Sequence, residues 1–257
     1  MKKKLTLQLL DYPDPLQPFL KNCTAYDSSS HSGARVIYLD NGYYLKSDAK
    51  GKLNREATIA KWFAKAGLGV PVIHYLSTDK DYLLTKEAPG KNATYYLHEP
   101  EAICKVLAQK LKELHHLAPQ NFPASHSLDY YRKVAQDNYE KGYFSPKALL
   151  PQFGISNREE AYRLIQEKGH LLTPDALIHG DACLPNIILN NNLSFSAFID
   201  VGSAGISDKH IDLYWAIWSL HYNLGTSKYG ELFLDYYGRK NIDTEKLRLI
   251  AAFEAFG

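Results

Sequence analysis

The most informative part of the sequence is a polar loop between two apolar runs, at residues 177–189. It reads LIHGDACLPNIIL, so a His-x-Asp-x4-Asn pattern formed by His179, Asp181 and Asn186 is flanked by residues typical of short strands. A later apolar run ends in FIDVG, which places Asp200 at the end of a β segment. A hairpin loop that carries Asp181 and Asn186, followed by a strand that ends at Asp200, can bring these three polar side chains together.

The three residue types suit phosphoryl transfer. One carboxylate can receive or orient the proton of an acceptor hydroxyl, while an amide oxygen and a second carboxylate can hold Mg²⁺ on the phosphates of a nucleotide. A lone His-Gly-Asp is more often only a polar turn, and an Asp after a strand is often only a cap. The complete set of residues favours the functional interpretation over the structural one.

These motifs, together with Ser207-Asp208-Lys209 and Asp212-Leu213, resemble the catalytic core of the protein-kinase-like fold. The pair HGDACLPN and FIDVG is most similar to that of the aminoglycoside 3′-phosphotransferases (kanamycin kinases), and the resemblance runs from about residue 25 to the C-terminus. It implies an α+β, two-lobed fold. On this resemblance, residues 1–87 would form a small antiparallel β-rich N-terminal lobe that binds the nucleotide, and residues 88–257 would form a larger, mainly helical lobe for catalysis and acceptor binding.

The resemblance also implies roles for the residues of the loop. Asp181 would be the catalytic base, and Asn186 and Asp200 would be the ligands of Mg²⁺. His179 would have a structural role in the loop, and Asp212 would stiffen the loop from a helix beneath it. The implied cofactors are Mg²⁺ and ATP, with GTP as an open alternative.

In the N-terminal lobe, the resemblance assigns residues to the nucleotide. Lys46, in the second strand of a hairpin and at its end, would contact the α- and β-phosphates, and Glu56 on the following helix would pair with it. Tyr44 matches the aromatic residue that stacks on adenine. Glu87 and Ala88 resemble the hinge whose backbone hydrogen-bonds adenine. The plainer interpretations are a solvated lysine, a helix-surface glutamate and cross-strand packing of the tyrosine.

A serine-rich loop at residues 27–33 precedes the hairpin. On the same resemblance, its backbone N–H groups and the hydroxyls of Ser30 and Ser32 would cover the phosphates. The loop has one glycine and no GxGxxG motif, so by itself it is typical of any surface turn.

The acceptor site is predicted less strongly than the reaction. Aminoglycosides are polycations, and relatives bind them with clustered acids, many of them late in the chain. Here Glu254 and Phe256 match the family's C-terminal pattern, but Phe253 replaces its first acid. Trp218 and Tyr222 stand in a region where relatives often carry Arg and acids. A kinase for another small alcohol, sugar or amino-sugar antibiotic is therefore the alternative, and a non-catalytic nucleotide-binding module is the alternative from another class.

The rest of the chain fits a β-rich front and a helical back. Asp40-Asn41-Gly42 predicts the turn of a hairpin, and Asn54 is expected to cap the helix that follows. No element is assigned over residues 119–156. The remaining expectations are strands at 34–39, 43–46, 72–77 and 82–85, helices at 55–66, 101–117, 158–167 and 208–224 and from 232 to the end, and short strands within 177–198.

Composition excludes several classes of protein. The chain has 257 residues, of which 45% are hydrophobic and 23% charged, which is ordinary for a globular protein and not for a disordered one. The net charge of +2 is too balanced to indicate a nucleic-acid binder. No apolar run is long enough to span a membrane, and three cysteines without a CxxC pair suggest neither a disulfide framework nor a zinc site. We expect a cytoplasmic monomer or dimer that binds a small-molecule acceptor, and no nucleic acid or membrane.

Overall fold

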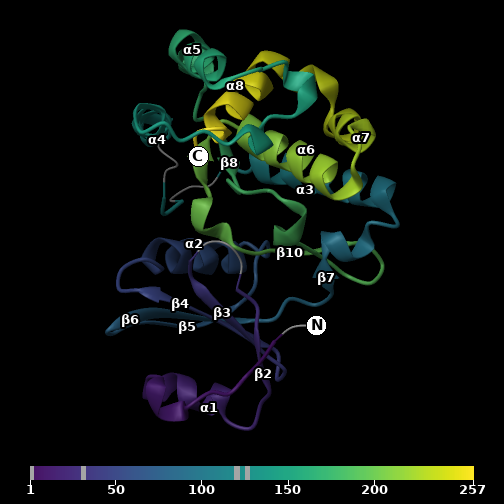
Figure 1. The fold of residues 1–257 in the computed structure, drawn as a ribbon. Coiled ribbons are helices and arrows are strands. Elements are labelled where there is room, and N and C mark those ends of the chain that lie inside the picture. Colours follow the sequence, from purple (N-terminus) through teal and green to yellow (C-terminus); the bar gives the residue numbers. More distant parts are fainter. Residues whose placement is uncertain (1–2, 30–32, 119–121, 125–127) are drawn as a thin grey trace. The chain divides into compact units, whose positions relative to one another are not determined.

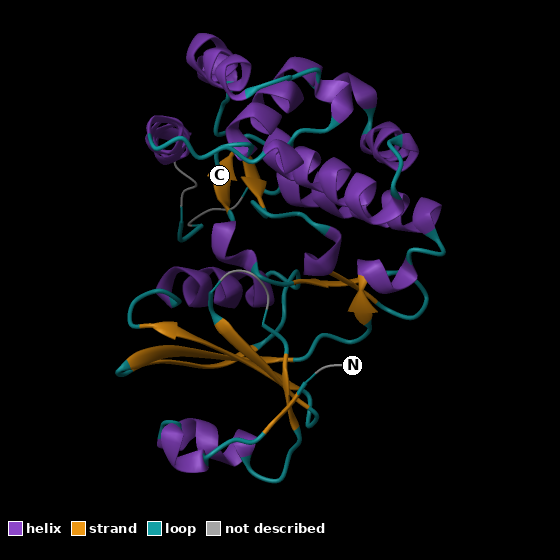
Figure 2. Cartoon of the chain, in the orientation of Figure 1, coloured by secondary structure: helices purple, strands orange, loops and turns teal. Residues whose placement is uncertain are grey.

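The computed structural model describes residues 3–29, 33–118, 122–124 and 128–257 (Figures 1 and 2). It divides into two compact units. Unit 1 consists of Met1–Gly90 with Ser196–Gly202, and unit 2 consists of Lys91–Phe195 with Ser203–Gly257. Unit 1 is built on an antiparallel sheet and unit 2 is mainly helical, which confirms the predicted α+β class.

Unit 1 contains a six-stranded antiparallel sheet in the order β1-β2-β3-β4-β6-β5. The predicted hairpin is confirmed, and Gly42 in its turn has φ +90°, a conformation that glycine adopts without strain. The strands are β1 (Lys4–Leu5), β2 (Ala25–Asp27), β3 (Arg35–Leu39), β4 (Tyr43–Ala49), β5 (Val72–Ser77) and β6 (Lys80–Lys86).

The second strand of the hairpin is longer than predicted. Lys46 lies within β4 and not at its end, because the strand continues to Ala49. The reason is tertiary: β4 pairs on both sides, with Lys46 opposite Val36 of β3 and Leu83 of β6. A residue held in two ladders has a fixed backbone position, which favours a defined placement of its side chain.

The helix after the hairpin, α2 (Asn54–Lys65), confirms the prediction in extent but not in its start. Asn54 is the first helical residue and provides no side-chain cap. Instead, the buried carboxylate of Asp81 in β6 accepts a hydrogen bond from the Leu53 N–H at 2.9 Å. The helix start is therefore fixed by a neighbouring strand.

At the other end of the unit, Leu16 and Leu20, from the turn and short helix α1 (Gln17–Leu20), pack into the sheet's core.

Unit 2 contains six helices among the described residues. They are α3 (Pro100–His116), α4 (Leu128–Glu140), α5 (Arg158–Lys168), α6 (His210–Leu224), α7 (Lys228–Tyr237) and α8 (Thr244–Glu254). The helix α6 is buried along most of its length, α7 and α8 pack against it, and α3 packs against α7 (Figure 1). The helix predicted from residue 232 to the end is two helices, because Gly238 with φ +102° ends α7 and Asp243 caps α8.

The short strands predicted within 177–198 are confirmed as β8 (Ala176–Ile178), β9 (Ile187–Leu189) and β10 (Phe195–Phe198). Two further strands that were not predicted, β7 (Lys91–Asn92) and β11 (Gly205–Ser207), pair with them. In unit 2, β8 pairs with β11 and β7 pairs with β9, so the polar loop leaves one pair and enters the other. In unit 1, the end of β10 is held by the Phe198 N–H, which donates to the Leu68 carbonyl at 2.8 Å.

All three cysteines, which lie in the described part of the chain, are free thiols. Burial raises the pKa of each of them, to about 12 for Cys104. None of the helices in the described residues is both long and apolar enough to cross a bilayer.

Candidate functional site

A cluster of one lysine and two acids lies in unit 1. The Lys46 ammonium donates to both carboxylate oxygens of Glu56, at 3.0 and 2.8 Å, and to Oδ1 of Asp200 at 2.9 Å. The side chains of Lys46 and Glu56 are 16% and 14% exposed, whereas that of Asp200 is 42% exposed. Asp200 is therefore the member of the cluster that is most open to a ligand.

The charge of Lys46 is maintained by its partners. Burial acts against the ammonium, but the nearby Glu56 and Asp200 carboxylates outweigh it and raise the pKa of Lys46. A lysine held as a cation between a strand and a helix is suited to contact anionic oxygens such as those of phosphates.

The segment after β10 is folded tightly against α2. Asp200 has φ +55°, a left-handed conformation that residues other than glycine rarely adopt and that occurs more often at functional sites. Two residues later, the Gly202 carbonyl accepts a hydrogen bond from Nε of Arg55 at 3.1 Å. A Cβ at Gly202 would lie 3.4 Å from Cβ of Glu56, an ordinary van der Waals contact, so Gly202 lies directly beside Glu56.

The predicted adenine-binding residues lie together at one end of β4. The rings of Tyr38 and Tyr44 have centroids 5.0 Å apart, and the Tyr38 hydroxyl donates to the Glu87 carboxylate at 3.2 Å. Burial raises the pKa of Tyr44 to about 12, so its hydroxyl stays protonated. Ala88 follows and is half-buried. Tyr44, Glu87 and Ala88 therefore share one region of unit 1.

The predicted phosphate-covering serines, Ser30 and Ser32, lie outside the described residues. Immediately before them, the Ser29 N–H donates to the Asp27 carboxylate at 3.0 Å, which is a local turn contact.

In unit 2, Asn186 is hydrogen-bonded directly to Asp181. Its Nδ2 donates to Oδ2 of Asp181 at 2.8 Å and to the Asp181 carbonyl at 3.0 Å. The Asp181 N–H donates to Nδ1 of His179 at 3.2 Å, and His179 is fully buried. Since Nδ2 of Asn186 is engaged, its amide oxygen is the atom that can face a cation.

The loop is held from beneath by Asp212, as expected. The fully buried carboxylate accepts hydrogen bonds from the His179 and Gly180 N–H groups, both at 2.7 Å, and contacts Nε2 of His115 at 3.1 Å. Burial alone would raise the pKa of Asp212, but these hydrogen bonds and the nearby histidines lower it. Gly180 has φ +82°, and a Cβ there would lie 2.3 Å from the Ser203 carbonyl oxygen. The loop backbone is thus fixed just before Asp181.

Glu254, at the end of α8, is the one acid of the predicted acceptor set. It is half-buried, and its carboxylate accepts a hydrogen bond from the Tyr131 hydroxyl at 2.7 Å and another from the Trp215 side chain. Burial raises the pKa of Glu254 to about 7, and the negative charge of Asp181 acts in the same direction. Glu254 therefore belongs electrostatically to the surroundings of Asp181.

The other three predicted acceptor residues differ in exposure. The rings of Trp218 and Tyr222 are stacked, with centroids 5.0 Å apart, and Tyr222 is 72% exposed. Trp215, which donates to Glu254, packs edge-on against Trp218. In contrast, Phe256 is 1% exposed and its ring packs among other aromatic rings, so it acts in the core. A pocket of about 270 Å³ lies beside it, lined by Asn138, Tyr143, Phe144, Ser145, Ala255, Phe256 and Gly257.

The chain matches the Phosphotransferase enzyme family over residues 28–250. It belongs to this family. It is 41% identical to a probable aminoglycoside 3′-phosphotransferase of Lactococcus lactis subsp. lactis (strain IL1403), with 99% of this chain and 98% of the relative covered. It is 30% identical to a streptomycin 3″-kinase of Streptomyces griseus, with 72% of this chain and 73% of the relative covered.

Solved structures of phosphotransferases have the same fold. An aminoglycoside-3′-phosphotransferase of type VIII superposes with a TM-score of 0.73 at 24% identity, covering 97% of this chain and 99% of the other. The aminoglycoside phosphotransferase APH(3″)-Id of Streptomyces rimosus gives 0.75 at 21% identity, covering 98% and 99%. These similarities confirm the predicted protein-kinase-like fold.

Some contacts of this phosphotransferase's site had no signal in the sequence. His115 and Tyr131 lie 66 residues and 50 residues before Asp181 (181 − 115 and 181 − 131), on separate helices. His115 lies near the end of the amphipathic helix α3, where a polar residue is expected to face solvent. Tyr131 lies within residues 119–156, to which no element was assigned. Only their partners, Asp212 and Glu254, carried recognisable motifs.

Proposed function

We propose that the chain transfers the γ-phosphate of ATP to a hydroxyl group of an aminoglycoside, of the 3′ type named for the lactococcal relative. The observation that carries this proposal is the loop in which Asn186 orients the Asp181 carboxylate while Asp212 holds the preceding backbone. A carboxylate that is oriented in this way suits the acceptance of a proton from an attacking hydroxyl.

In this proposal, unit 1 binds the nucleotide. The Lys46 ammonium contacts the α- and β-phosphates, and Glu56 holds the lysine side chain in place. Tyr44 stacks on adenine, and the backbone of Glu87 and Ala88 hydrogen-bonds its edge. Different groups therefore contact the face of the adenine ring and its polar edge.

The implied metal fits the donor set of the chain. Asn186 and Asp200 offer an amide oxygen and an exposed carboxylate, and such hard oxygen donors suit Mg²⁺. Within the described residues, no group of three or more His, Cys, Asp or Glu side chains could hold a metal ion. When bound, Mg²⁺ would neutralise phosphate charge.

Asp181 acts as the base. Asn186 orients its carboxylate through a hydrogen bond to Oδ2, and the carboxylate accepts the proton of the acceptor hydroxyl. The acceptor oxygen forms a bond to the γ-phosphorus, the bond from that phosphorus to the bridging oxygen breaks, and ADP leaves with the electron pair. The proton on Asp181 then passes to solvent.

Glu254, Trp218 and Tyr222 contact the acceptor in this proposal, and Phe256 supports them from the core. The carboxylate of Glu254 pairs with an ammonium group of the acceptor. The exposed π face of Tyr222 can bind a second cation or the apolar face of a sugar ring.

The test is release of ADP, with ATP and Mg²⁺, over a panel of kanamycin, neomycin, amikacin and neutral sugars. Asp181→Asn should bind nucleotide normally and lower kcat by roughly 10²–10⁴, the usual contribution of a general base. Asp129→Asn is the matched control, because this carboxylate is 90% exposed on α4 and pairs only locally with Arg132. Turnover of Asp181→Asn close to that of the wild type would refute the role of Asp181.

A kinase for another sugar or amino-sugar is the second candidate, favoured by the aromatic pair Trp218 and Tyr222. Turnover of a neutral sugar that exceeds turnover of every aminoglycoside in the panel would select it. Binding of ATP without acceptor-dependent ADP release would instead favour a nucleotide-binding module.

A further inference from the structure

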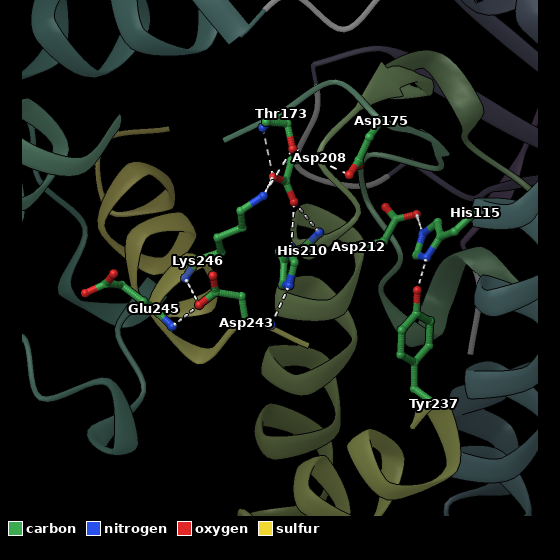
Figure 3. A network of polar contacts seen from close by, with 10 residues as sticks. All are labelled: His115, Thr173, Asp175, Asp208, His210, Asp212, Tyr237, Asp243, Glu245 and Lys246. Carbon is green, nitrogen blue, oxygen red and sulfur yellow. Dashed lines mark hydrogen bonds and ion pairs between the residues drawn. The ribbon is translucent and has the colours of Figure 1, made fainter. Parts of the chain in front are cut away.

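A chain of buried hydrogen bonds runs from Tyr237 on α7 through His115 to Asp212 (Figure 3). The Tyr237 hydroxyl lies 2.8 Å from Nδ1 of His115, and Nε2 of the same imidazole lies 3.1 Å from Oδ2 of Asp212. The exposed fractions of Tyr237, His115 and Asp212 are 1%, 7% and 0%. Water therefore does not compete for these contacts.

The chemistry of the three groups gives the chain a direction. The Asp212 carboxylate is charged, since its pKa is lowered, and it can only accept, so Nε2 of His115 carries a proton. A tautomer with its proton on Nε2 leaves Nδ1 as an acceptor, to which the Tyr237 hydroxyl can donate. Burial and nearby carboxylates raise the pKa of Tyr237, so the hydroxyl keeps this proton.

The far end of the chain meets the proposed catalytic loop. Oδ2 of Asp212 accepts from His115 and also from the His179 N–H, while Oδ1 accepts from the Gly180 N–H. Asp181 is the next residue. The carboxylate plane of Asp212 is thus fixed from one side by an imidazole and from the other by the backbone that positions Asp181.

We propose that Tyr237 and His115 are positioning residues for phosphoryl transfer, an inference that rests on the proposed function of Asp181 as the base. Tyr237 fixes the tautomer and the ring orientation of His115. His115 fixes the Asp212 carboxylate, which fixes the backbone of residues 179 and 180. Neither residue contacts the reacting atoms.

Packing alone does not explain the polar groups. Apolar residues of similar size could fill the same space, because replacing both partners of a buried hydrogen bond by apolar groups is often close to neutral for stability. A linked chain of polar groups instead specifies one arrangement of its members. Removing one hydrogen bond of this network should therefore affect the free energy of unfolding and kcat differently.

The test cuts the chain at its outer end in the full-length protein. Tyr237→Phe keeps the ring and removes the donor, and we expect kcat to fall about 3- to 10-fold while KM for ATP changes less than about 2-fold, since small misplacements of a catalytic group lower the rate steeply. His115→Leu should lower kcat by about 10²-fold. His115→Gln, which keeps an N–H donor for Asp212, should retain more of kcat than His115→Leu.

The matched control is Tyr96→Phe. Tyr96 is a buried tyrosine of unit 2 whose hydroxyl contacts the Leu189 carbonyl and Asn191, not the loop. We expect it to leave kcat within about 2-fold of the wild type, the scatter expected of a substitution away from the chain. An unchanged kcat in Tyr237→Phe, or an equal loss in both tyrosine variants, would overturn the proposal.

A second measurement is independent of turnover. Hydrogen exchange of the His179 and Gly180 amides should accelerate in Tyr237→Phe and not in Tyr96→Phe. If the wild type shows no phosphotransferase activity while this difference in exchange is present, the proposed function fails and the link from Tyr237 to the loop stands. If the two amides exchange equally in both variants, the link itself is refuted.

Discussion

At the scale of single residues, Glu254 has an unusual environment. Its carboxyl group receives two hydrogen bonds, yet burial and the charge of Asp181 raise its pKa to about 7. Glu254 is therefore neutral below this pH and charged above it. On the proposed function, it attracts ammonium groups of the acceptor only in the charged form.

We predict that KM for the acceptor rises as the pH is lowered from 8 to 6, because Glu254 is protonated over this interval. Glu254→Gln should have a raised KM at pH 8 and a flatter profile, with KM for ATP unchanged. Steady-state kinetics against pH measures both. If KM for the acceptor depends on pH in the same way in Glu254→Gln as in the wild type, Glu254 does not bind the acceptor.

The same group affects folding. The pKa of Glu254 is raised from 4.5 to about 7, so the folded state binds more protons than the unfolded state between these values. The contribution of Glu254 to stability therefore falls as the pH rises through this window. Glu254→Gln should be more stable than the wild type above pH 7, in urea unfolding, and the gain should shrink towards pH 5.

The sequence identified some of these residues and not others, for a physical reason. Asp181 and Asn186 occur in one short loop, and the resemblance of this motif to that of a known family indicated their roles. The pKa of Glu254 depends on Tyr131 and Trp215, which approach it only when three helices have packed. No local sequence pattern predicts these contacts.

At the scale of elements, the turn from β8 into the loop depends on Gly180. Its φ of +82° is costly for other residues, and an added Cβ would meet the Ser203 backbone, which cannot yield as a flexible side chain would. This turn places the N–H groups that Asp212 binds. The loop and the helix beneath it are therefore joined through a position that requires glycine.

We predict that Gly180→Ala destabilises the protein by at least about 2 kcal/mol, from backbone strain and the clash together, and lowers kcat. Gly154→Ala is the control, since Gly154 has φ +60° but open space around it, and it should cost only about 1 kcal/mol. Urea unfolding compares the two. Equal losses of stability would show that the contact with Ser203 is not limiting.

Element boundaries were less predictable than element types. The extension of β4 to Ala49 follows from pairing with β3 and β6, and the start of α2 follows from Asp81, a residue 28 positions away. The helix α4 was not predicted, because only Leu128 and Ala135 among its residues are buried. Tertiary contacts decided each of these cases.

At the scale of the whole molecule, a second buried network ties three segments of unit 2 together (Figure 3). The Asp208 carboxylate accepts hydrogen bonds from Lys246 at 2.8 Å, His210 at 2.6 Å and the Thr173 N–H at 3.0 Å. His210 in turn accepts from the Asp243 N–H, at the start of α8. Burial would raise the pKa of Asp208, but these contacts lower it far below its usual value.

We predict that Lys246→Met destabilises the protein by about 3 kcal/mol, because it leaves a buried carboxylate without its cation. Because the pKa of Asp208 is lowered, its stabilisation is complete above pH 3.8 and is lost as the pH falls below that value. Acid unfolding should therefore begin at a higher pH in Lys246→Met than in the wild type. The exposed Lys240→Met is the control in urea and acid titrations. Equal urea and acid midpoints in Lys246→Met and Lys240→Met would refute a stabilising role of the Lys246–Asp208 pair.

The fold as a whole was predictable from little of the sequence. HGDACLPN and FIDVG indicated the kinase-like class through their resemblance to the catalytic core of that fold. The networks around Asp208 and Asp212 were not predictable, since they join residues from helices that are far apart along the chain. The sequence motifs therefore indicate the reaction better than they indicate the buried hydrogen-bond networks around the site.

The burial of the thiols has a practical consequence. Maleimides react with thiolates, and the raised pKa of each cysteine lowers its thiolate fraction at neutral pH, so all three should react more slowly than an ordinary exposed thiol. A cysteine introduced at an exposed surface position would be the most reactive thiol in the molecule. Fluorophores or spin labels could then be attached to unit 1 and unit 2 in the otherwise native sequence, and the distance between the labels could be followed as nucleotide and acceptor bind.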